Sequence, residues 1–244
     1  MVFGVTRVAV VIGAICGAVA TNEASAQIHP NSRNEPGRDW TKLFVYRGAI
    51  AVNKHGRRYV DESLSYKLLG DAVLRQPDAI AYQTFDQGIM DQAADGVPPF
   101  DFRSAGRRGL LLQADSVEAL AAKIGVDAAT LVSTVQRYND FVANGRDEDF
   151  GREGLSTGYG KLVKIERPPF YAYPSTSGLI ATYCGLTVDP GARVIDVFGE
   201  PIGRLFAAGE LMGGFHGVAY MTGSSLGKCV IFGRIAGRNA ATVK

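Results

Sequence analysis

A glycine-rich stretch near the end of the chain, residues 204–237, constrains the fold more than any other segment. Its first part, residues 205–208, is apolar and predicts a strand that enters a long glycine loop. Residues 226–240 then predict a helix, with Ser224 and Ser225 at the position of its N-terminal cap. Because a helix N-terminus carries free N–H groups and a partial positive charge, this segment predicts a site for an anion or a polarised carbonyl.

The glycine loop also carries two side chains suited to a ligand site, His216 and Tyr220, among glycines that let the backbone approach a ligand closely. The whole stretch resembles the C-terminal signature of the fumarate reductase and ketosteroid dehydrogenase flavoproteins. In those proteins it holds the isoalloxazine of FAD and one side of the substrate pocket. Glu210 resembles the acidic residue that bonds the ribityl hydroxyls of the flavin. The resemblance implies FAD as the cofactor, with contacts from Ala208, Gly209, Glu210, Ser224, Ser225 and Leu226.

Three further motifs extend the resemblance over residues 12–244. Residues 27–30 match the family's QxHP motif. Residues 47–63 look like its RGxxxLVNxxGxRFxxE segment. Asp189 lies where the family has its GG(V/L)xID strand pair. Together the motifs imply that most of the chain follows the family's pattern.

The resemblance implies an α+β fold in which a capping, or substrate, domain (residues 28–173) is attached to the C-terminal remnant of an α/β FAD-binding domain (residues 174–244). Residues 1–27 have two interpretations. The apolar run 8–20 and the Ala24-Ser25-Ala26 sequence are typical of a secretory signal with its cleavage site. The same region also resembles the family's internal helix that leads into the QxHP motif. We favour the internal helix, which predicts a cytoplasmic protein, whereas a signal peptide predicts a periplasmic or secreted one.

Family members begin with a strand and a GxGxxG turn that bind the ADP half of FAD. Residues 8–17 offer glycines only at positions 13 and 17, so we expect this nucleotide-binding segment to be absent from the chain. The chain would then be a fragment of a longer flavoprotein, or a partner chain would supply the ADP-binding segment. In both cases we expect weak or absent FAD binding by the chain alone.

Substitutions within the family motifs bear on the substrate. Succinate and fumarate enzymes of this group hold a dicarboxylate with two arginines and two histidines. His29 matches one of those histidines, and Ala181 replaces the other. Tyr66 and Tyr220 replace the two arginines. Because each charge-assisted bond from arginine to carboxylate contributes about 1.5–3 kcal/mol, a dicarboxylate would bind poorly.

The two tyrosines resemble those of the ketosteroid Δ1-dehydrogenases. There, one tyrosine removes a proton beside a ketone while hydride passes from the neighbouring carbon to flavin N5, and the other tyrosine hydrogen-bonds the carbonyl. The resemblance assigns proton transfer to Tyr66 and the carbonyl contact to Tyr220. The predicted activity is an FAD-dependent reaction at a CH–CH bond next to a ketone, on a hydrophobic ketone or enone. The remaining predicted substrate contacts are His29, His216, Gly223 and Ser224.

Two other functions stay open. A fumarate-reductase-like enzyme for a different unsaturated acid would use His29, Arg47 or Lys67 as its anion contact. A non-catalytic exported binding protein, descended from the flavoprotein, would agree with the Ala24-Ser25-Ala26 sequence and with the absent ADP-binding fold.

Charge and cysteine content argue against several other classes. The formal net charge of +2 gives little support for a nucleic-acid partner, which calls for a clustered basic face. The apolar run near the N-terminus is too short to predict a membrane span. The cysteines Cys16, Cys184 and Cys229 have no metal-ligand spacing, so no metal site is predicted.

Periodicity and turn residues predict the elements that lie between the motifs. A helical hairpin is expected from residues 117–124, introduced by the capping pattern Asp115-x-x-Glu118, and residues 128–144, capped by Asp127. The other predicted elements are a helix at 63–73 and strands at 49–52, 58–60, 79–85, 178–182, 186–188 and 192–195.

Overall fold

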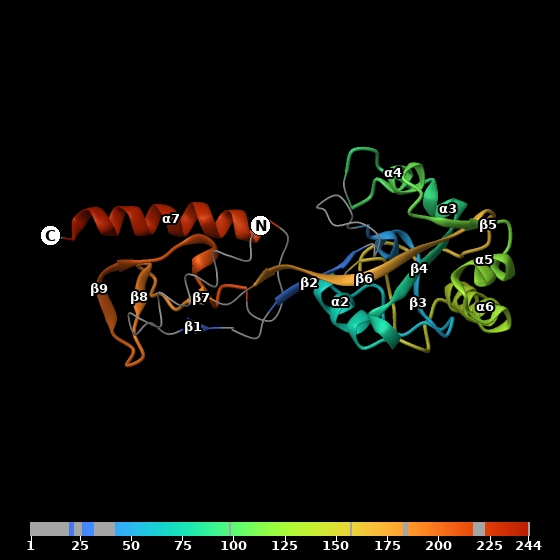
Figure 1. The fold of residues 1–244 in the computed structure, drawn as a ribbon, viewed down its shortest axis with the longest axis horizontal. Helices are drawn as coiled ribbons and strands as arrows, with labels where there is room; N and C mark the ends of the chain where they lie inside the picture. Colours follow the sequence, from blue (N-terminus) through green and yellow to red (C-terminus); the bar gives the residue numbers. More distant parts are fainter. Residues whose placement is uncertain are drawn as a thin grey trace. The chain divides into compact units, whose positions relative to one another are not determined.

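The computed structural model describes residues 20–21, 26–31, 42–97, 99–156, 158–182, 185–216 and 223–243. Helices and strands are mixed along the chain (Figure 1). The chain divides into two compact units, residues 29–178 and residues 1–28 with 179–244. We call these the sheet unit and the terminal unit, and each is described by itself. Their assignment as a capping domain and an FAD-domain remnant stays a prediction.

A five-stranded sheet organises the sheet unit. Its order is β2-β6-β4-β3, with β5 also paired to β6. β4 is antiparallel to both neighbours, so Thr84 lies opposite Ile50 in β3 and opposite Ala172 in β6. The predicted strands at 49–52, 79–85 and 178–182 correspond to β3, β4 and the end of β6. The bounds are β2 Ala26–Asn31, β3 Ile50–Asn53, β4 Ala81–Asp86, β5 Leu112–Ala114 and β6 Phe170–Thr182.

The strand predicted at residues 58–60 is wrong. Arg58 makes an isolated bridge to Val52, and the chain then leaves the ladder. The backbone N–H of Ala51 donates to the carboxylate of Glu62 at 3.0 Å. Because the carboxylate of Glu62 accepts from the N–H of Ala51, that N–H is not available to pair with a strand at residues 58–60. The segment therefore forms a turn.

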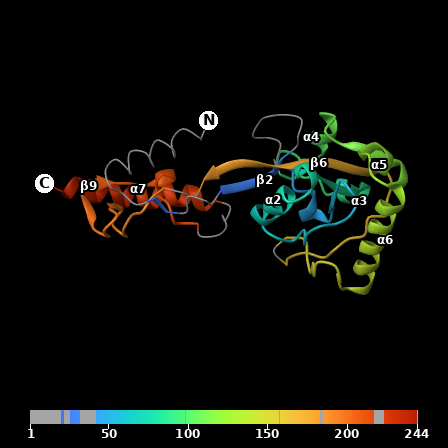
Figure 2. The ribbon, with the colours of Figure 1, turned by 60° about the horizontal axis from the view of Figure 1, so that its bottom comes forward.

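Five α-helices surround this sheet among the described residues: α2 Tyr66–Leu74, α3 Gln87–Met90, α4 Phe102–Arg107, α5 Val117–Ile124 and α6 Ala128–Asn144. In both views α2 and α4 lie on opposite sides of the sheet (Figures 1 and 2). The predicted hairpin of α5 and α6 is confirmed, and α5 packs against β5.

The helix caps follow the prediction in part. Asp127 accepts a hydrogen bond from the N–H of Thr130 and caps α6, as predicted. The cap predicted at Asp115 is wrong, because the hydroxyl of Ser116 accepts from the N–H of Ala119 at the start of α5. α2 begins at Tyr66 rather than at residue 63, since the residues before it are held in a turn.

Aromatic rings fill the core of the sheet unit. Phe44 stacks on Phe85 and on Phe102, with ring centroids 4.2 Å apart in each pair, and all three rings are buried. Burying a side chain of this size contributes about 1.5–3 kcal/mol, so these contacts hold the sheet against α4. The α5–α6 hairpin adds an apolar face of Leu120, Leu131, Val135 and Tyr138.

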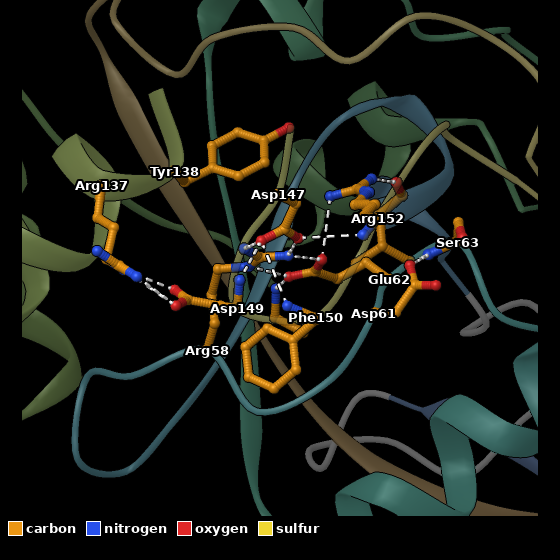
Figure 3. A network of polar contacts seen from close by, with 12 residues as sticks. Arg58, Asp61, Glu62, Ser63, Arg137, Tyr138, Asp147, Asp149, Phe150 and Arg152 are labelled. Carbon is orange, nitrogen blue, oxygen red and sulfur yellow. Dashed lines mark hydrogen bonds and ion pairs between the residues drawn. The ribbon is translucent and has the colours of Figure 1, made fainter. Parts of the chain in front are cut away.

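A buried ion network joins the turn after β3 to the loop after α6 (Figure 3). Arg58 Nη2 lies 2.6 Å from Glu62 Oε2 and 2.8 Å from Asp147 Oδ2. Arg152 Nη1 lies 3.2 Å from the same oxygen of Glu62. These side chains are at most 3% exposed, so water does not screen the charges.

The network is stable because each charge has several partners. Arg152 also donates to the carbonyl oxygens of Val45 at 2.7 Å and Ala49 at 3.1 Å. Removing a charge from water costs several kcal/mol, and this cost is met only where the geometry of the ion pairs and hydrogen bonds is good. The network therefore fixes Glu62, which lies just before α2, and thereby the start of that helix.

The described residues of the terminal unit form a small apolar core. Its described elements are β1 Ala20–Thr21, β7 Gly185–Leu186, β8 Arg193–Ile195, β9 Pro201–Phe206 and α7 Ser224–Thr242. β1 pairs with β7, β8 pairs with β9, and α7 contacts β9 (Figure 1). The buried apolar cluster that the described residues form consists of Leu186, Val194 and Ala207. The strands predicted at 186–188, 192–195 and 205–208 correspond to β7, β8 and the end of β9, and the predicted helix at 226–240 corresponds to α7.

None of the helices in the described part of the chain has both the length and the apolar character needed to cross a membrane.

The ion network generates a stability prediction. Glu62→Gln should lower the free energy of unfolding by about 3–5 kcal/mol, because Arg58 and Arg152 would lose the carboxylate that they share. Urea denaturation followed by circular dichroism measures the change. The matched control is Asp149→Asn, which breaks the more exposed ion pair with Arg137 and should cost less than about 1 kcal/mol. Equal losses in the two variants would contradict the role given to the network.

Candidate functional site

α7 begins directly after a glycine in the left-handed conformation. Gly223 occupies the N-cap position with φ of 89°, and the described residues provide no side-chain cap. The cap predicted from Ser224 and Ser225 is therefore wrong, because both serines lie inside the first turn of the helix. N–H groups at the start of a helix without a side-chain cap are suited to a ligand oxygen.

The two serines turn toward His216. Ser224 Oγ lies 3.4 Å from Nδ1 of the ring, and Ser225 Oγ lies 3.4 Å from Nε2. Burial lowers the pKa of His216, and the nearby charge of Lys228 lowers it further. The imidazole is therefore neutral at pH 7, with one ring nitrogen donating and the other accepting. The structure thus brings together three residues that the sequence predicted at the site.

Glu210 carries an unsatisfied oxygen. It lies in the 3-10 helix Gly209–Leu211, which follows β9 after Ala207 and Ala208. Its Oε1 is buried and has no hydrogen-bond partner among the described residues. Because buried carboxylate oxygens are nearly always hydrogen-bonded, this atom indicates a position where a ligand donor would bind.

A close backbone contact fixes the position of that 3-10 helix. A Cβ atom at Gly185 would lie 2.4 Å from the carbonyl oxygen of Leu211 and 2.6 Å from the nitrogen of Gly213. Glycine is thus required where β7 passes the 3-10 helix. The N–H of Gly213 also donates to the carbonyl of Leu186 at 3.1 Å. Glu210 is therefore held by backbone packing rather than by its own side chain.

Lys228 is a charged residue of this region that the sequence analysis missed. Its side chain lies one turn into α7, is 2% exposed, and donates from Nζ to the carbonyl of Met212 at 3.2 Å. Burial lowers the pKa of Lys228, and the negative charge of Glu210 partly opposes that shift. A signal was present in the sequence, since Lys228 is the only charged residue at positions 224–233.

Tyr66 is the first residue of α2 in the sheet unit, and it is half-buried. The next residue, Lys67, forms an ion pair with Asp71 at 2.6 Å along the same helix. The side chain at the start of α2 is therefore the phenol of Tyr66, and the charge of the neighbouring Lys67 is already paired.

Several predicted site residues are not tested. Tyr220 lies in residues 217–222, outside the described part of the chain. His29 in β2 and Ala181 in β6 are described by their backbone alone. Leu226, a predicted cofactor contact, is 73% exposed on α7. The pairing of Tyr66 with Tyr220 thus stays a prediction.

A family model described as "FAD binding domain" matches residues 12–226. The chain belongs to this family of FAD-dependent oxidoreductases. A probable fumarate reductase of Shewanella frigidimarina (strain NCIMB 400) is 34% identical over 225 residues, which is 92% of this chain and 36% of that protein. The 4-oxocyclohexanecarboxylate 2-dehydrogenase of Sinomonas cyclohexanicum is 34% identical over 224 residues, which is 80% of this chain and 37% of that protein.

Solved structures of the family agree with this assignment. The 3-ketosteroid Δ1-dehydrogenase of Sterolibacterium denitrificans, solved with 1,4-androstadiene-3,17-dione, matches with a TM-score of 0.77 and 29% identity. The match covers 98% of this chain and 46% of that structure. The chain thus spans less than half of that structure and little more than a third of the two sequence relatives.

The residues around α7 fit the family's cofactor. The unsatisfied oxygen of Glu210 suits a sugar-alcohol hydroxyl, and the first turn of α7 suits a carbonyl oxygen of the isoalloxazine. Gly209 adds a backbone with φ of 69°, a conformation that glycine adopts without steric cost. The individual FAD contacts predicted at residues 208–210 and 224–226 remain proposals.

The burial of Lys228 generates a pH prediction. In the folded protein burial favours the neutral amine, whereas in the unfolded chain lysine keeps its proton up to a pKa of about 10.4. The unfolded state therefore binds more protons, and stability should rise as the pH increases from the lowered pKa toward 10.4. Lys228→Met should flatten this rise, which urea denaturation from pH 7 to about pH 10 measures.

The control for this prediction is Lys123→Met. Lys123 also donates to a backbone carbonyl, that of Gln113 at 2.6 Å, but its side chain is exposed. This variant should keep the pH dependence of the unmodified protein. An unchanged slope in Lys228→Met would show that the lysine is solvated in the folded state.

Proposed function

We propose that the chain forms the substrate-side part of an FAD-dependent oxidoreductase that acts on a carbon–carbon bond next to a ketone. The observation that carries the proposal is Tyr66. A half-buried phenol begins α2 at the position where the resemblance to succinate and fumarate enzymes calls for an arginine. A neutral phenol is poorly suited to neutralise a carboxylate, but it hydrogen-bonds a ketone or exchanges a proton with the carbon beside it.

The neighbourhood of Tyr66 also argues against a dicarboxylate. Lys67 is paired with Asp71, so its charge is already matched within α2. Among relatives, the 4-oxocyclohexanecarboxylate dehydrogenase and the 3-ketosteroid dehydrogenase are both named for cyclic ketones. These names support a cyclic ketone as the substrate class.

The proposed roles divide the reaction into a proton and a hydride. When bound, FAD supplies a two-electron acceptor or donor for hydride. Tyr66 exchanges the proton of the carbon next to the ketone, and Tyr220 donates a hydrogen bond to the ketone oxygen, which favours the enol. In the dehydrogenation direction the substrate loses one proton and one hydride, and a carbon–carbon double bond forms.

One observation favours a second candidate, a reductase of an unsaturated acid. Nε of Arg47 is buried and has no hydrogen-bond partner among the described residues, while its guanidinium lies 4.5 Å from the centre of the Phe100 ring. The buried Nε supports Arg47 as an anion contact, Lys67 is already paired with Asp71, and the side chain of His29 lies outside what the structure describes.

We further propose that additional protein, from the same polypeptide or from a partner chain, covers α7 and completes the FAD site. Leu226, Val230 and Ile231 are 73%, 64% and 58% exposed on this helix. A cluster of apolar side chains in contact with water on one helix indicates an interaction surface. The greater length of the relatives supports an ADP-binding segment as the covering part.

The role of Tyr66 predicts the result of removing its hydroxyl. In FAD-loaded protein, Tyr66→Phe should lower kcat by about 10²–10⁴-fold with little change in KM, because it removes the proton-transfer group and leaves the ring. The assay follows reduction of a dye by 3-ketosteroid or by 4-oxocyclohexanecarboxylate. Tyr159→Phe is the control, since that phenol is 80% exposed. Full turnover by Tyr66→Phe, or inhibition by fumarate that Arg47→Met abolishes, would favour the unsaturated-acid reductase.

The exposed side of α7 predicts weak cofactor retention. Purified residues 1–244 should lose FAD on desalting, as judged by visible flavin absorbance, because the cofactor would be held from one side. Addition of an ADP-binding segment from a family member should increase retention, and Glu210→Ala should reverse that gain. Stoichiometric FAD on the chain alone would contradict the prediction.

A further inference from the structure

The N-terminus of α2 is capped in an unusual way. Ser65 holds the N-cap position with extended backbone angles, φ of −58° and ψ of 147°, but its hydroxyl makes no capping hydrogen bond. Ser65 Oγ is buried and has no partner among the described residues. An N-cap serine ordinarily accepts a hydrogen bond from the first turn of its helix, so the usual capping group is inactive here.

The hydroxyl of Tyr46 takes the place of that cap. Tyr46 Oη donates to the carbonyl oxygen of Leu64 at 2.7 Å, across 18 residues of sequence. A backbone hydrogen bond from Tyr66 to the same phenol acts to lower the pKa of Tyr46, against the larger effect of burial. One hydroxyl therefore holds the backbone on both sides of Ser65, at the point where the helix begins.

The segment that carries Tyr46 is itself rigid. It belongs to the 3-10 helix Phe44–Arg47, in which Phe44 and Val45 are buried. The N–H of Val45 donates to Gln83 Oε1 at 3.3 Å, and its carbonyl accepts from Arg152 Nη2 at 2.7 Å. The phenol is thus attached to the aromatic core on one side and to the buried ion network on the other.

We propose that Tyr46 is the positioning residue for Tyr66, capping α2 from outside the helix so that the proposed proton-transfer phenol begins it in a fixed place. The inference rests on the proposed function for the role of Tyr66, but the capping itself does not. A helix start fixed by a tertiary contact holds its first side chain more tightly than a local serine cap, because the cap is anchored in the core.

The pKa of Tyr46 agrees with a structural role for Tyr46 and a chemical role for Tyr66. Burial raises the pKa of Tyr46, and the neighbouring phenol of Tyr66 raises it further. Tyr46 therefore stays a neutral phenol at physiological pH, able both to donate and to accept. It serves as a structural hydrogen-bonding group, while the chemistry is left to Tyr66.

The first experiment tests the capping in the chain of residues 1–244 without cofactor. Tyr46→Phe should accelerate amide hydrogen exchange in the first turn of α2 by about fivefold, as expected for loss of a cap. Ser65→Ala should leave that exchange unchanged or slower, which reverses the usual effect of removing an N-cap serine. Faster exchange in Ser65→Ala and none in Tyr46→Phe would overturn the proposal.

The matched control is Tyr171→Phe. It also removes a phenol hydroxyl with a hydrogen bond, from Tyr171 Oη to Gln87 Oε1 at 2.6 Å, but it does so away from α2. This variant should leave exchange in the first turn of α2 unchanged. Acceleration there by Tyr171→Phe to the same degree would show a general loss of stability and would overturn the specific role of Tyr46.

The second experiment tests positioning in the FAD-loaded protein. Tyr46→Phe should lower kcat on the order of ten- to a hundredfold with KM unchanged, because a displaced proton-transfer group slows the chemical step and leaves binding intact. Faster exchange in α2 with unchanged kcat would overturn the positioning role. If Tyr66→Phe keeps full turnover while Tyr46→Phe still loosens α2, the proposed function fails and the capping stands, so the two failures are distinguishable.

Discussion

The buried pairing of Arg58 and Arg152 with Glu62 and Asp147 is the constraint on which the sheet unit depends. These charges are removed from water, and their desolvation is compensated when all of them are in place. The network therefore ties the turn after β3, the 3-10 helix before it and the loop after α6 into one arrangement. Through Glu62 the network also fixes the turn that precedes α2, and through Val45 it fixes the 3-10 helix that carries Tyr46. A structural element built for stability thus positions the proposed catalytic residue.

The terminal unit follows a different principle. Its backbone geometry is set by glycines, at Gly185 where β7 passes the 3-10 helix and at Gly223 where α7 begins. Its apolar core is small among the described residues, and α7 leaves apolar side chains in water. We infer that the protein that completes the FAD site also stabilises the terminal unit. A partner that binds only the folded form raises the free energy of unfolding.

The proposed chemistry follows from exchanging guanidinium groups for phenols. An arginine carries a permanent charge and selects carboxylates, whereas a tyrosine offers one neutral hydroxyl that suits a ketone and a mobile proton. A phenol also needs more exact placement, since it lacks the charge that attracts substrate over a distance. The contact from Tyr46 to the start of α2 supplies that placement for Tyr66. Arg47 stays a proposed contact for an acid substrate.

The sequence by itself determined the family and the locally encoded elements. The α5–α6 hairpin was predictable because the Asp127 cap and the helical periodicity lie within the helices themselves. Tertiary structure alone decided the features that depend on partners distant in sequence. Glu62 accepts from the N–H of Ala51 and ends a predicted strand, and the hydroxyl of Tyr46 donates to the carbonyl of Leu64 just before α2. Such hydrogen bonds leave no local pattern, because the chain must first fold to bring donor and acceptor together.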